Sequence, residues 1–266
     1  MIKRVLLIVV CILALTSVSA FAQLKTGLQS LPGKLPHIET RYKWIQYDFD
    51  LNQEKFYIYV PANYTDTEPF GILVFLGPSD NCIAVPPGWE AVLARHKLIY
   101  IAPQKIGNKQ QIARRVGLAI IGAMKLSEFA KIDTTRIYVS GMSGGARIAS
   151  FAAFAHPNLF SSVFAVCGIN FCRKVPRVKA TQTDEYGYFS IDPRQADETK
   201  RRVKFALVTG PKDFRYGNIL DIYQGGLLPD GYKVKLFDVP GMGHEICSAK
   251  ILNDGLSWFE EPPPRQ

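Results

Sequence analysis

The feature of this chain that most constrains its fold is a series of short, continuous apolar runs that recur between segments with helical spacing. Continuous apolar runs of this length are typical of strands buried on both faces, as in a parallel sheet. Their alternation with helices predicts an α/β fold, in which a mostly parallel, doubly wound sheet carries helices on both faces. The expected strands are 71–76, 98–102, 136–140, 162–166, 203–208 and 233–239, and the expected helices are 89–95, 112–130, 144–155, 217–223 and 246–259.

Two earlier runs, 42–49 and 55–60, alternate more strongly and predict an antiparallel hairpin at one edge of the sheet. A chain of 266 residues is long enough for one hydrophobic core, so we expect a single domain over residues 39–260. Polar, proline-containing residues 23–38 precede this domain, and residues 261–266 form a frayed tail.

The N-terminus has the three parts of a secretory signal peptide. Lys3 and Arg4 are followed by an apolar run that is short for a membrane span, and then by Ala20-Phe21-Ala22, an A-x-A cleavage signal. We expect residues 1–22 to be removed, with cleavage after Ala20 or an uncleaved anchor as alternatives. The protein would then be secreted, extracellular or periplasmic, with no stable membrane insertion.

The net charge of +9 is not accompanied by an aromatic-rich nucleic-acid motif. Export also argues against a nucleic-acid partner, so we expect a monomer whose basic surface is solvated. No CxxC pattern or His/Cys spacing indicates a metal.

A candidate nucleophile lies where a predicted strand meets a predicted helix. Gly141, Ser143 and Gly145 form a Gly-x-Ser-x-Gly pattern, directly after the run 136–140. In a sheet of this kind ligands bind beyond the carboxyl ends of the strands, and a serine on such a sharp turn is exposed there at a helix N-terminus. The alternative is a glycine-rich turn without chemistry.

A serine needs a base and an orienting acid. Of the four histidines, His244 follows the last predicted strand at the same edge as Ser143, and we expect it to be the base. Asp213 lies in the loop directly after the predicted strand 203–208 and is the expected acid, with Asp221 as the runner-up.

A tetrahedral intermediate also needs an oxyanion hole, for which the N–H after the nucleophile, that of Gly144, is one donor. The second donor should come from the loop after the run 71–76. Pro78 has no N–H, which leaves Gly77 or Ser79, and we favour Ser79.

Four cysteines remain after the signal peptide, an even number that suggests two disulfides in an exported protein. Cys82 and Cys247 fall at one edge of the sheet and Cys167 and Cys172 are close in sequence, so we expect these two pairs among the three pairings that are possible.

The polar, basic segment 168–202 interrupts the strand and helix pattern and predicts an insertion, which is a candidate lid. Its aromatic residues, Tyr186, Tyr188 and Phe189, either bind a sugar, feruloyl or polyester chain or pack the insertion down. Its basic residues either favour acidic polysaccharides or form a solvated face.

Several segments, in this order, resemble the α/β-hydrolases: "IYVPANY", "ILVFLG", "DTTRIYVSGMSGGARIASFAAFAHPNLFSSVFAVCG", "TGPKDF" and "GMGHE". They look most like the secreted esterases grouped with polyhydroxybutyrate depolymerases and feruloyl or acetylxylan esterases. The resemblance covers roughly residues 50 to 260. It implies that Ser143, Asp213 and His244 cleave carboxylic esters through an acyl-enzyme, without a cofactor, on a small or polymeric ester substrate.

The chain departs from that family's pattern in two loops. Leu76-Gly77-Pro78 stands where the family usually has His-Gly, and Phe214 and Arg215 follow the acid where the family continues differently. Two other functions stay open: a serine peptidase of the prolyl-oligopeptidase type, and a noncatalytic relative that binds a ligand in its cleft.

Overall fold

The computed structural model describes residues 24–32, 49–81, 84–176 and 188–262. Within them one sheet has the strand order β1-β2-β4-β3-β5-β6-β7-β8. The strands are β1 (Gly27–Pro32), β2 (Lys55–Val60), β3 (Phe70–Leu76), β4 (Leu98–Pro103), β5 (Ile132–Met142), β6 (Ser162–Val166), β7 (Lys204–Thr209) and β8 (Lys233–Asp238). The helices are η1 (Leu51–Gln53), α2 (Trp89–Arg95), α3 (Ile112–Leu126), α4 (Gly144–Ala155), α5 (Pro193–Arg202), α6 (Tyr216–Ile222), the π-helical turn η2 (Tyr223–Leu227) and α7 (Ala249–Glu260).

The sheet is parallel from β4 through β3 to β8, as predicted, and only the β1–β2 and β2–β4 pairs are antiparallel among the described strands. The antiparallel edge differs from the prediction, because β1 is formed by Gly27–Pro32 within the polar segment 23–38. An edge strand needs few apolar residues, which is why its pattern is weak. Most of the expected strand 42–49 lies outside the described residues.

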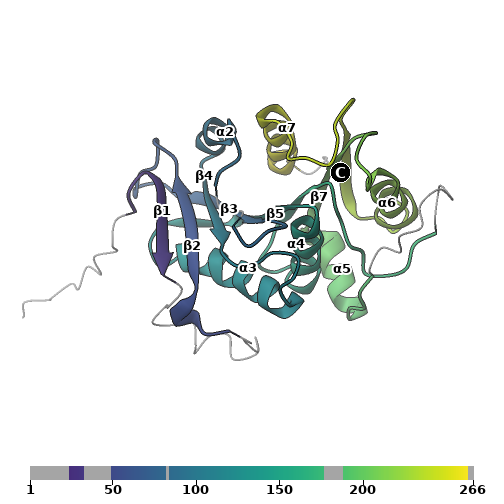
Figure 1. Cartoon of the computed structure of the whole chain (residues 1–266), viewed down its shortest axis with the longest axis horizontal. Coiled ribbons are helices and arrows are strands. Elements are labelled where there is room, and N and C mark those ends of the chain that lie inside the picture. Colours follow the sequence, from purple (N-terminus) through teal and green to yellow (C-terminus); the bar gives the residue numbers. More distant parts are fainter. Residues whose placement is uncertain (1–23, 33–48, 82–83, 177–187, 263–266) are drawn as a thin grey trace, which may run out of the picture.

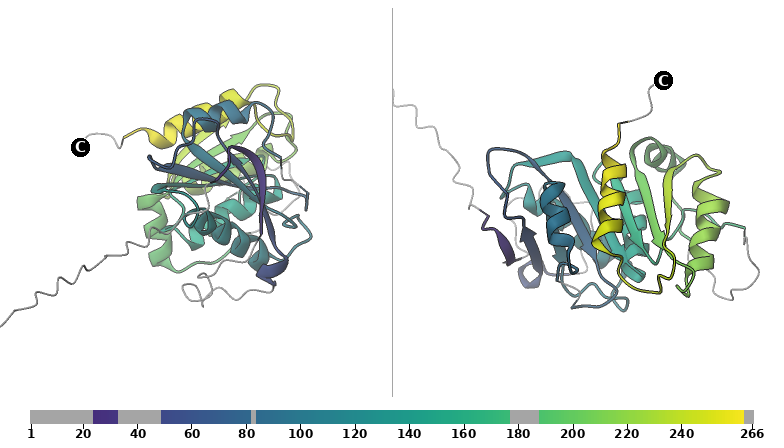
Figure 2. Two further views of the ribbon diagram at one scale, coloured as in Figure 1. Left: turned by 90° about the vertical axis from the view of Figure 1, so that its left-hand side faces the viewer. Right: turned by 90° about the horizontal axis from the view of Figure 1, so that it is seen from above.

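Helices cover both faces of the sheet, which confirms the doubly wound architecture (Figure 1). Helices α2 and α7 lie side by side on one face, and α3, α4 and α5 lie on the other (Figures 1 and 2). Alternate residues of β3 enter the two cores: Ile72 and Val74 pack on the side of α3 and α4, whereas Leu73 and Phe75 pack on the side of α2 and α7.

The segment 168–202 is not irregular throughout. Its last part is α5, which begins at Pro193 after Asp192, whose carboxylate accepts the Arg194 N–H as a helix cap. Gln195 donates to the Ala155 carbonyl at 3.2 Å, so the start of α5 lies at the C-terminal end of α4, away from Ser143. This part of the segment is therefore a crossover helix between β6 and β7 and does not form a lid.

Among the described residues, no helix combines the length and the apolar character that a membrane span requires. The expected signal peptide, residues 1–22, lies outside the described residues.

Candidate active site

Ser143 lies at a strained turn between β5 and α4. Its backbone has φ 55° and ψ −121°, which a residue with a Cβ rarely adopts. The turn is tight because β3 passes directly beside it: a Cβ on Gly145 would lie 1.8 Å from the Leu76 carbonyl oxygen, and one on Gly141 would lie 2.6 Å from the same atom. Both glycines are therefore required for this close approach.

The three residues of the expected triad lie in hydrogen-bonding contact. His244 Nε2 is 2.9 Å from Ser143 Oγ, and His244 Nδ1 is 2.7 Å from Asp213 Oδ1. A carboxylate can only accept, so Nδ1 donates to Asp213 and Nε2 accepts the hydroxyl proton of Ser143. The imidazole is thereby held in the tautomer that a general base needs.

Asp213 is itself fixed by neighbours from the end of β7 and from its own loop. Its side chain is fully buried. Oδ2 accepts from Thr209 Oγ1 at 2.8 Å, and Oδ1 accepts a second hydrogen bond from the Arg215 N–H at 2.9 Å. Burying a carboxylate without such hydrogen bonds would be costly. Asp221, the runner-up, lies within α6.

Phe214 covers the histidine from the solvent side. Its ring centroid is 4.1 Å from that of His244, with the planes tilted by 36°, and the side chain is 59% exposed. An exposed aromatic ring in this position offers an apolar surface to a ligand.

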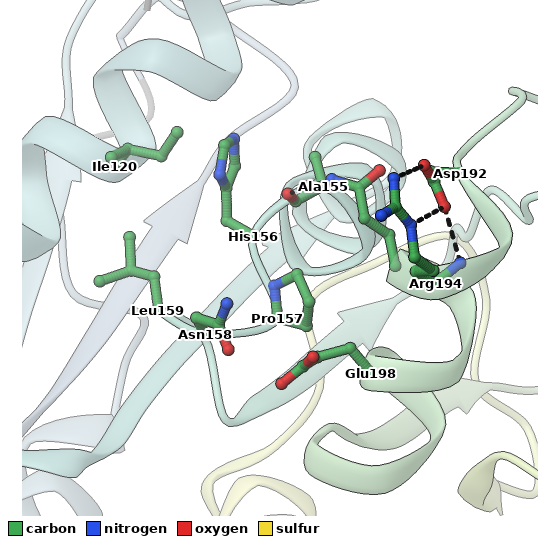
Figure 3. A pocket seen from close by; sticks show the side chains of 10 residues that line it. Ile120, Ala155, His156, Pro157, Asn158, Leu159, Asp192, Arg194 and Glu198 are labelled. Carbon is green, nitrogen blue, oxygen red and sulfur yellow. Dashed lines mark hydrogen bonds and ion pairs between the residues drawn. The ribbon is translucent and has the colours of Figure 1, made fainter. Parts of the chain in front are cut away.

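The other described histidines lie away from the serine. His96 Nδ1 is 2.9 Å from Glu260. His156 lies at the C-terminal end of α4, where it lines a cavity of about 730 Å³ with Leu159, Glu198 and the Asp192–Arg194 ion pair (Figure 3). Burial lowers the pKa of His156 to about 4. Neither residue can serve Ser143, which lies at the opposite end of α4.

The two predicted donors of the oxyanion hole, Gly144 and Ser79, lie in different surroundings. The Gly144 N–H lies in the first turn of α4, where a helix leaves its N–H groups without intrahelical acceptors. Ser79 is exposed, and among the described residues it is Asn108, and not Ser79, that lines the cavity with Ser143 and Gly144. A Cβ on Gly144 would lie 1.9 Å from Asn108 Oδ1, so this amide rests directly on the helix start.

Three arginines that the sequence analysis did not select line the same cavity, which has a volume of about 400 Å³. Arg147 follows Ser143 by one helical turn, Arg215 follows Asp213 by two residues, and Arg115 comes from the first turn of α3. The spacing from Ser143 and Asp213 could have indicated the first two residues. Nothing in the sequence links Arg115 to the others, because its helix meets α4 only in the folded chain.

The predicted Cys167–Cys172 disulfide is not formed. Cys167 and Cys172 are free thiols, because Cys167 packs in the core on the side of α2 and α7 whereas Cys172 packs against the opposite core. Cys247 is also a free, buried thiol, and its expected partner Cys82 lies outside the described residues. Cys167 Sγ instead contacts the carbonyls of Gly243 and Glu245 at 3.5 and 3.4 Å.

Neither described member of the expected aromatic platform, Tyr188 or Phe189, lines the cavity at Ser143. Phe189 packs against Phe151 and Phe154 of α4, with ring centroids 4.6 and 5.5 Å away. Tyr188 is 62% exposed and pairs by a backbone bridge with Phe171. Tyr186 lies outside the described residues. The structure therefore favours the alternative in which Phe189 packs the segment down.

One group of side chains has the chemistry and spacing to hold a metal ion. Cys167 Sγ, a carboxylate oxygen of Asp213 and a ring nitrogen of His244 lie within 4.8 Å of one another. Burial, and then the charge of Asp213, raise the pKa of the Cys167 thiol. The uncharged thiol is a weak metal ligand, so these groups fit the serine–histidine–aspartate arrangement better.

Comparison with known proteins identifies the fold. No known protein family and no curated protein sequence matches the chain. Solved structures do match: a ferulic acid esterase (TM-score 0.59, 13% identity, 89% of this chain and 96% of that one) and an arylesterase (0.58, 13%, 91% and 87%). An esterase from Rhizomucor miehei also matches (0.57, 12%, 78% and 77%). At these identities the similarity shows an α/β-hydrolase fold, as the resemblance implied.

Proposed function

We propose that this protein is a serine hydrolase that cleaves carboxylic esters through an acyl-enzyme. The observation that carries the proposal is the unbroken chain of contacts from Asp213 through His244 to Ser143, at the carboxyl edge of the sheet. His244 accepts the proton of Ser143 as the hydroxyl attacks the ester carbonyl, and then returns it to the leaving alcohol. The Gly144 N–H stabilises the oxyanion, and Ser79 as the second donor stays a prediction.

The strained backbone of Ser143 supports this proposal independently. A conformation with φ 55° and ψ −121° costs on the order of 1–3 kcal/mol and persists where it positions a reactive group. Here it aims the hydroxyl at His244 and places the nucleophile at a helix N-terminus, where developing negative charge is favoured.

Purified protein, assayed with 4-nitrophenyl acetate and butyrate, should turn over both, and Ser143→Ala should lose at least about a thousandfold in rate with the fold intact. A panel with polyhydroxybutyrate, feruloyl esters and acetylated xylan tests the substrates that the resemblance implies. Absence of ester turnover together with absence of fluorophosphonate labelling would contradict the proposal, and a peptide amide cleaved faster than the esters would favour a peptidase.

We also propose that the protein is exported after removal of residues 1–22. The charged start, the apolar run and the A-x-A motif support this proposal. N-terminal sequencing of the exported protein should begin at Gln23, and an intact Met1 on a cytoplasmic protein would contradict it.

A further inference from the structure

The cavity above Ser143 is strongly and unevenly charged. Arg115, Arg147 and Arg215 all line it, and among the described residues that line it none carries a carboxylate. Three guanidinium groups around one small cavity give it a positive potential, which attracts an anion. The residues that line this cavity therefore indicate a negatively charged ligand.

Of the three arginines, Arg115 is the one whose position is hardest to explain by a structural role. Its side chain is 5% exposed, and its Nε is a buried nitrogen without a hydrogen-bond partner among the described residues. A terminal nitrogen lies 3.4 Å from both the Gly77 carbonyl and Asn108 Oδ1, which are long contacts for a buried cation. A buried charge with so few partners is costly, and a bound anion would offset that cost.

The surroundings of Arg115 on balance disfavour its positive charge. Burial and the charge of Arg147 lower the pKa of Arg115 to about 10, and Asp80 only partly opposes them. The Asp80 carboxylate accepts hydrogen bonds from the Gly107 N–H and from Gln110. Asp213 is engaged with His244. Asp80 and Asp213 therefore each form hydrogen bonds with groups other than Arg115.

The other two arginines are held in place by contacts that leave them on the cavity wall. Arg147 Nε donates to Asn170 at 2.8 Å. The Arg215 guanidinium lies 5.3 Å from the centroid of the Phe214 ring. Phe214 and Ile112, exposed at the same cavity, add an apolar surface beside the charged one. The cavity thus matches a ligand with an apolar body and a negatively charged end.

We propose that the ester cleaved at Ser143 carries an anionic group, a carboxylate or a similar oxyanion, which Arg115, Arg147 and Arg215 bind. The inference rests on the proposed ester hydrolysis and names its substrate class. Planar guanidinium groups bind carboxylates through paired hydrogen bonds, and a positive cleft raises the rate at which anions arrive. The experiment below distinguishes an anion on the acyl part of the ester from one on the alcohol part.

The test uses rigid aromatic esters in which a para substituent cannot reach the ester carbonyl. For the alcohol part, 4-acetoxybenzoate is compared with 4-acetoxybenzamide. For the acyl part, the 4-nitrophenyl ester of 4-carboxybenzoate is compared with that of 4-carbamoylbenzoate. With each rate divided by that of hydroxide-catalysed hydrolysis, we expect kcat/KM to favour the anionic member of one pair by about thirtyfold. The preference should shrink as salt is added.

Arginine variants identify the groups responsible. Arg147→Gln and Arg215→Gln should each lower the anionic-to-neutral ratio of kcat/KM at least about tenfold. Arg194→Gln is the matched control, because Arg194 is 92% exposed and lies at the opposite end of α4; it removes the same charge and should leave the ratio unchanged. Arg115→Gln is added if it folds, as judged by circular dichroism.

Calorimetry with Ser143→Ala separates this proposal from the proposed function. Binding of 4-acetoxybenzoate but not of 4-acetoxybenzamide, lost in the Arg147→Gln double variant, supports an anion site even if the wild type cleaves no ester. Turnover of neutral and anionic esters at equal corrected rates, with no selective binding, overturns the anion proposal and leaves the esterase standing. Absence of both turnover and binding overturns both proposals.

Discussion

Gly145 offers the sharpest test of how the backbone positions the nucleophile. In Gly145→Ala the new Cβ would lie 1.8 Å from the Leu76 carbonyl oxygen, and real Cβ atoms essentially never approach closer than 3.0 Å. The end of β3 and the start of α4 must therefore separate by at least 1.2 Å. The clash is with backbone, which cannot rotate away, so we expect a loss of about 1–3 kcal/mol in the free energy of unfolding.

The same displacement acts on the chemistry. Ser143 precedes α4 directly, and its Oγ is 2.9 Å from His244 Nε2. A shift of this size breaks that alignment, and a misplacement of about 1 Å costs roughly a hundredfold in rate. We therefore expect Gly145→Ala to lower kcat/KM for 4-nitrophenyl acetate and the rate of fluorophosphonate labelling by about a hundredfold, while urea denaturation measures the loss of stability.

Gly122→Ala is the matched control. Gly122 lies within α3, and its added Cβ would meet Phe56 Cε1 at 3.4 Å, an ordinary contact. Alanine in a helix interior is expected to stabilise by up to about 1 kcal/mol, with activity unchanged. Wild-type labelling of Gly145→Ala would refute the reasoning, because the tight passage of β3 would then not control where Ser143 lies.

Three further changes test other parts of the account. Asp213→Asn should lower kcat by roughly 10³- to 10⁴-fold in steady-state assays, because an amide can donate to the imidazole and favours the wrong tautomer; near wild-type kcat would exclude this role. Thr209→Val removes the 2.8 Å hydrogen bond to Asp213 and should cost about 2 kcal/mol in urea unfolding as well as activity, whereas Thr199→Val, which loses only a bond to its own helix, should keep wild-type kcat. His156 is held neutral with a pKa of about 4, so the unfolded chain binds the extra proton between pH 6.5 and 4. The free energy of unfolding is therefore highest above pH 6.5 and falls by up to about 3 kcal/mol at pH 4. His156→Gln should remove this pH dependence, and the same pH dependence in wild type and variant would contradict the prediction.

The strands buried on both faces could be predicted well from the sequence. The run 162–166 coincides with β6, and 98–102 differs from β4 only at its last residue, because a continuous apolar run between polar segments marks a strand buried on both faces. The edge strand β1 could not be recognised, since one covered face requires few apolar residues. Helix α5 is strongly charged and was hidden by that composition, although Asp192 before Pro193 is a typical helix start.

The catalytic candidates could be selected because chain order and strand ends are readable along the sequence. Ser143, Asp213 and His244 each follow a predicted strand at the same edge. The pair Cys167–Cys172 was wrong because closeness in sequence does not say which face of the sheet a side chain enters, and these two thiols pack in opposite cores. Of the three arginines at the cavity, Arg147 and Arg215 could have been found from their spacing to Ser143 and Asp213, whereas Arg115 joins them only when α3 packs against α4.

The most direct test of the central claim is a rapid-mixing measurement with 4-nitrophenyl acetate, followed by peptide mass spectrometry of the acid-quenched protein. If Ser143 is the nucleophile, a burst should approach one 4-nitrophenolate per protein molecule, with the acetyl group on the peptide that contains Ser143, and neither signal should appear in Ser143→Ala. Steady turnover with an acetyl group on another residue, or a burst that survives in Ser143→Ala, would contradict this role of Ser143.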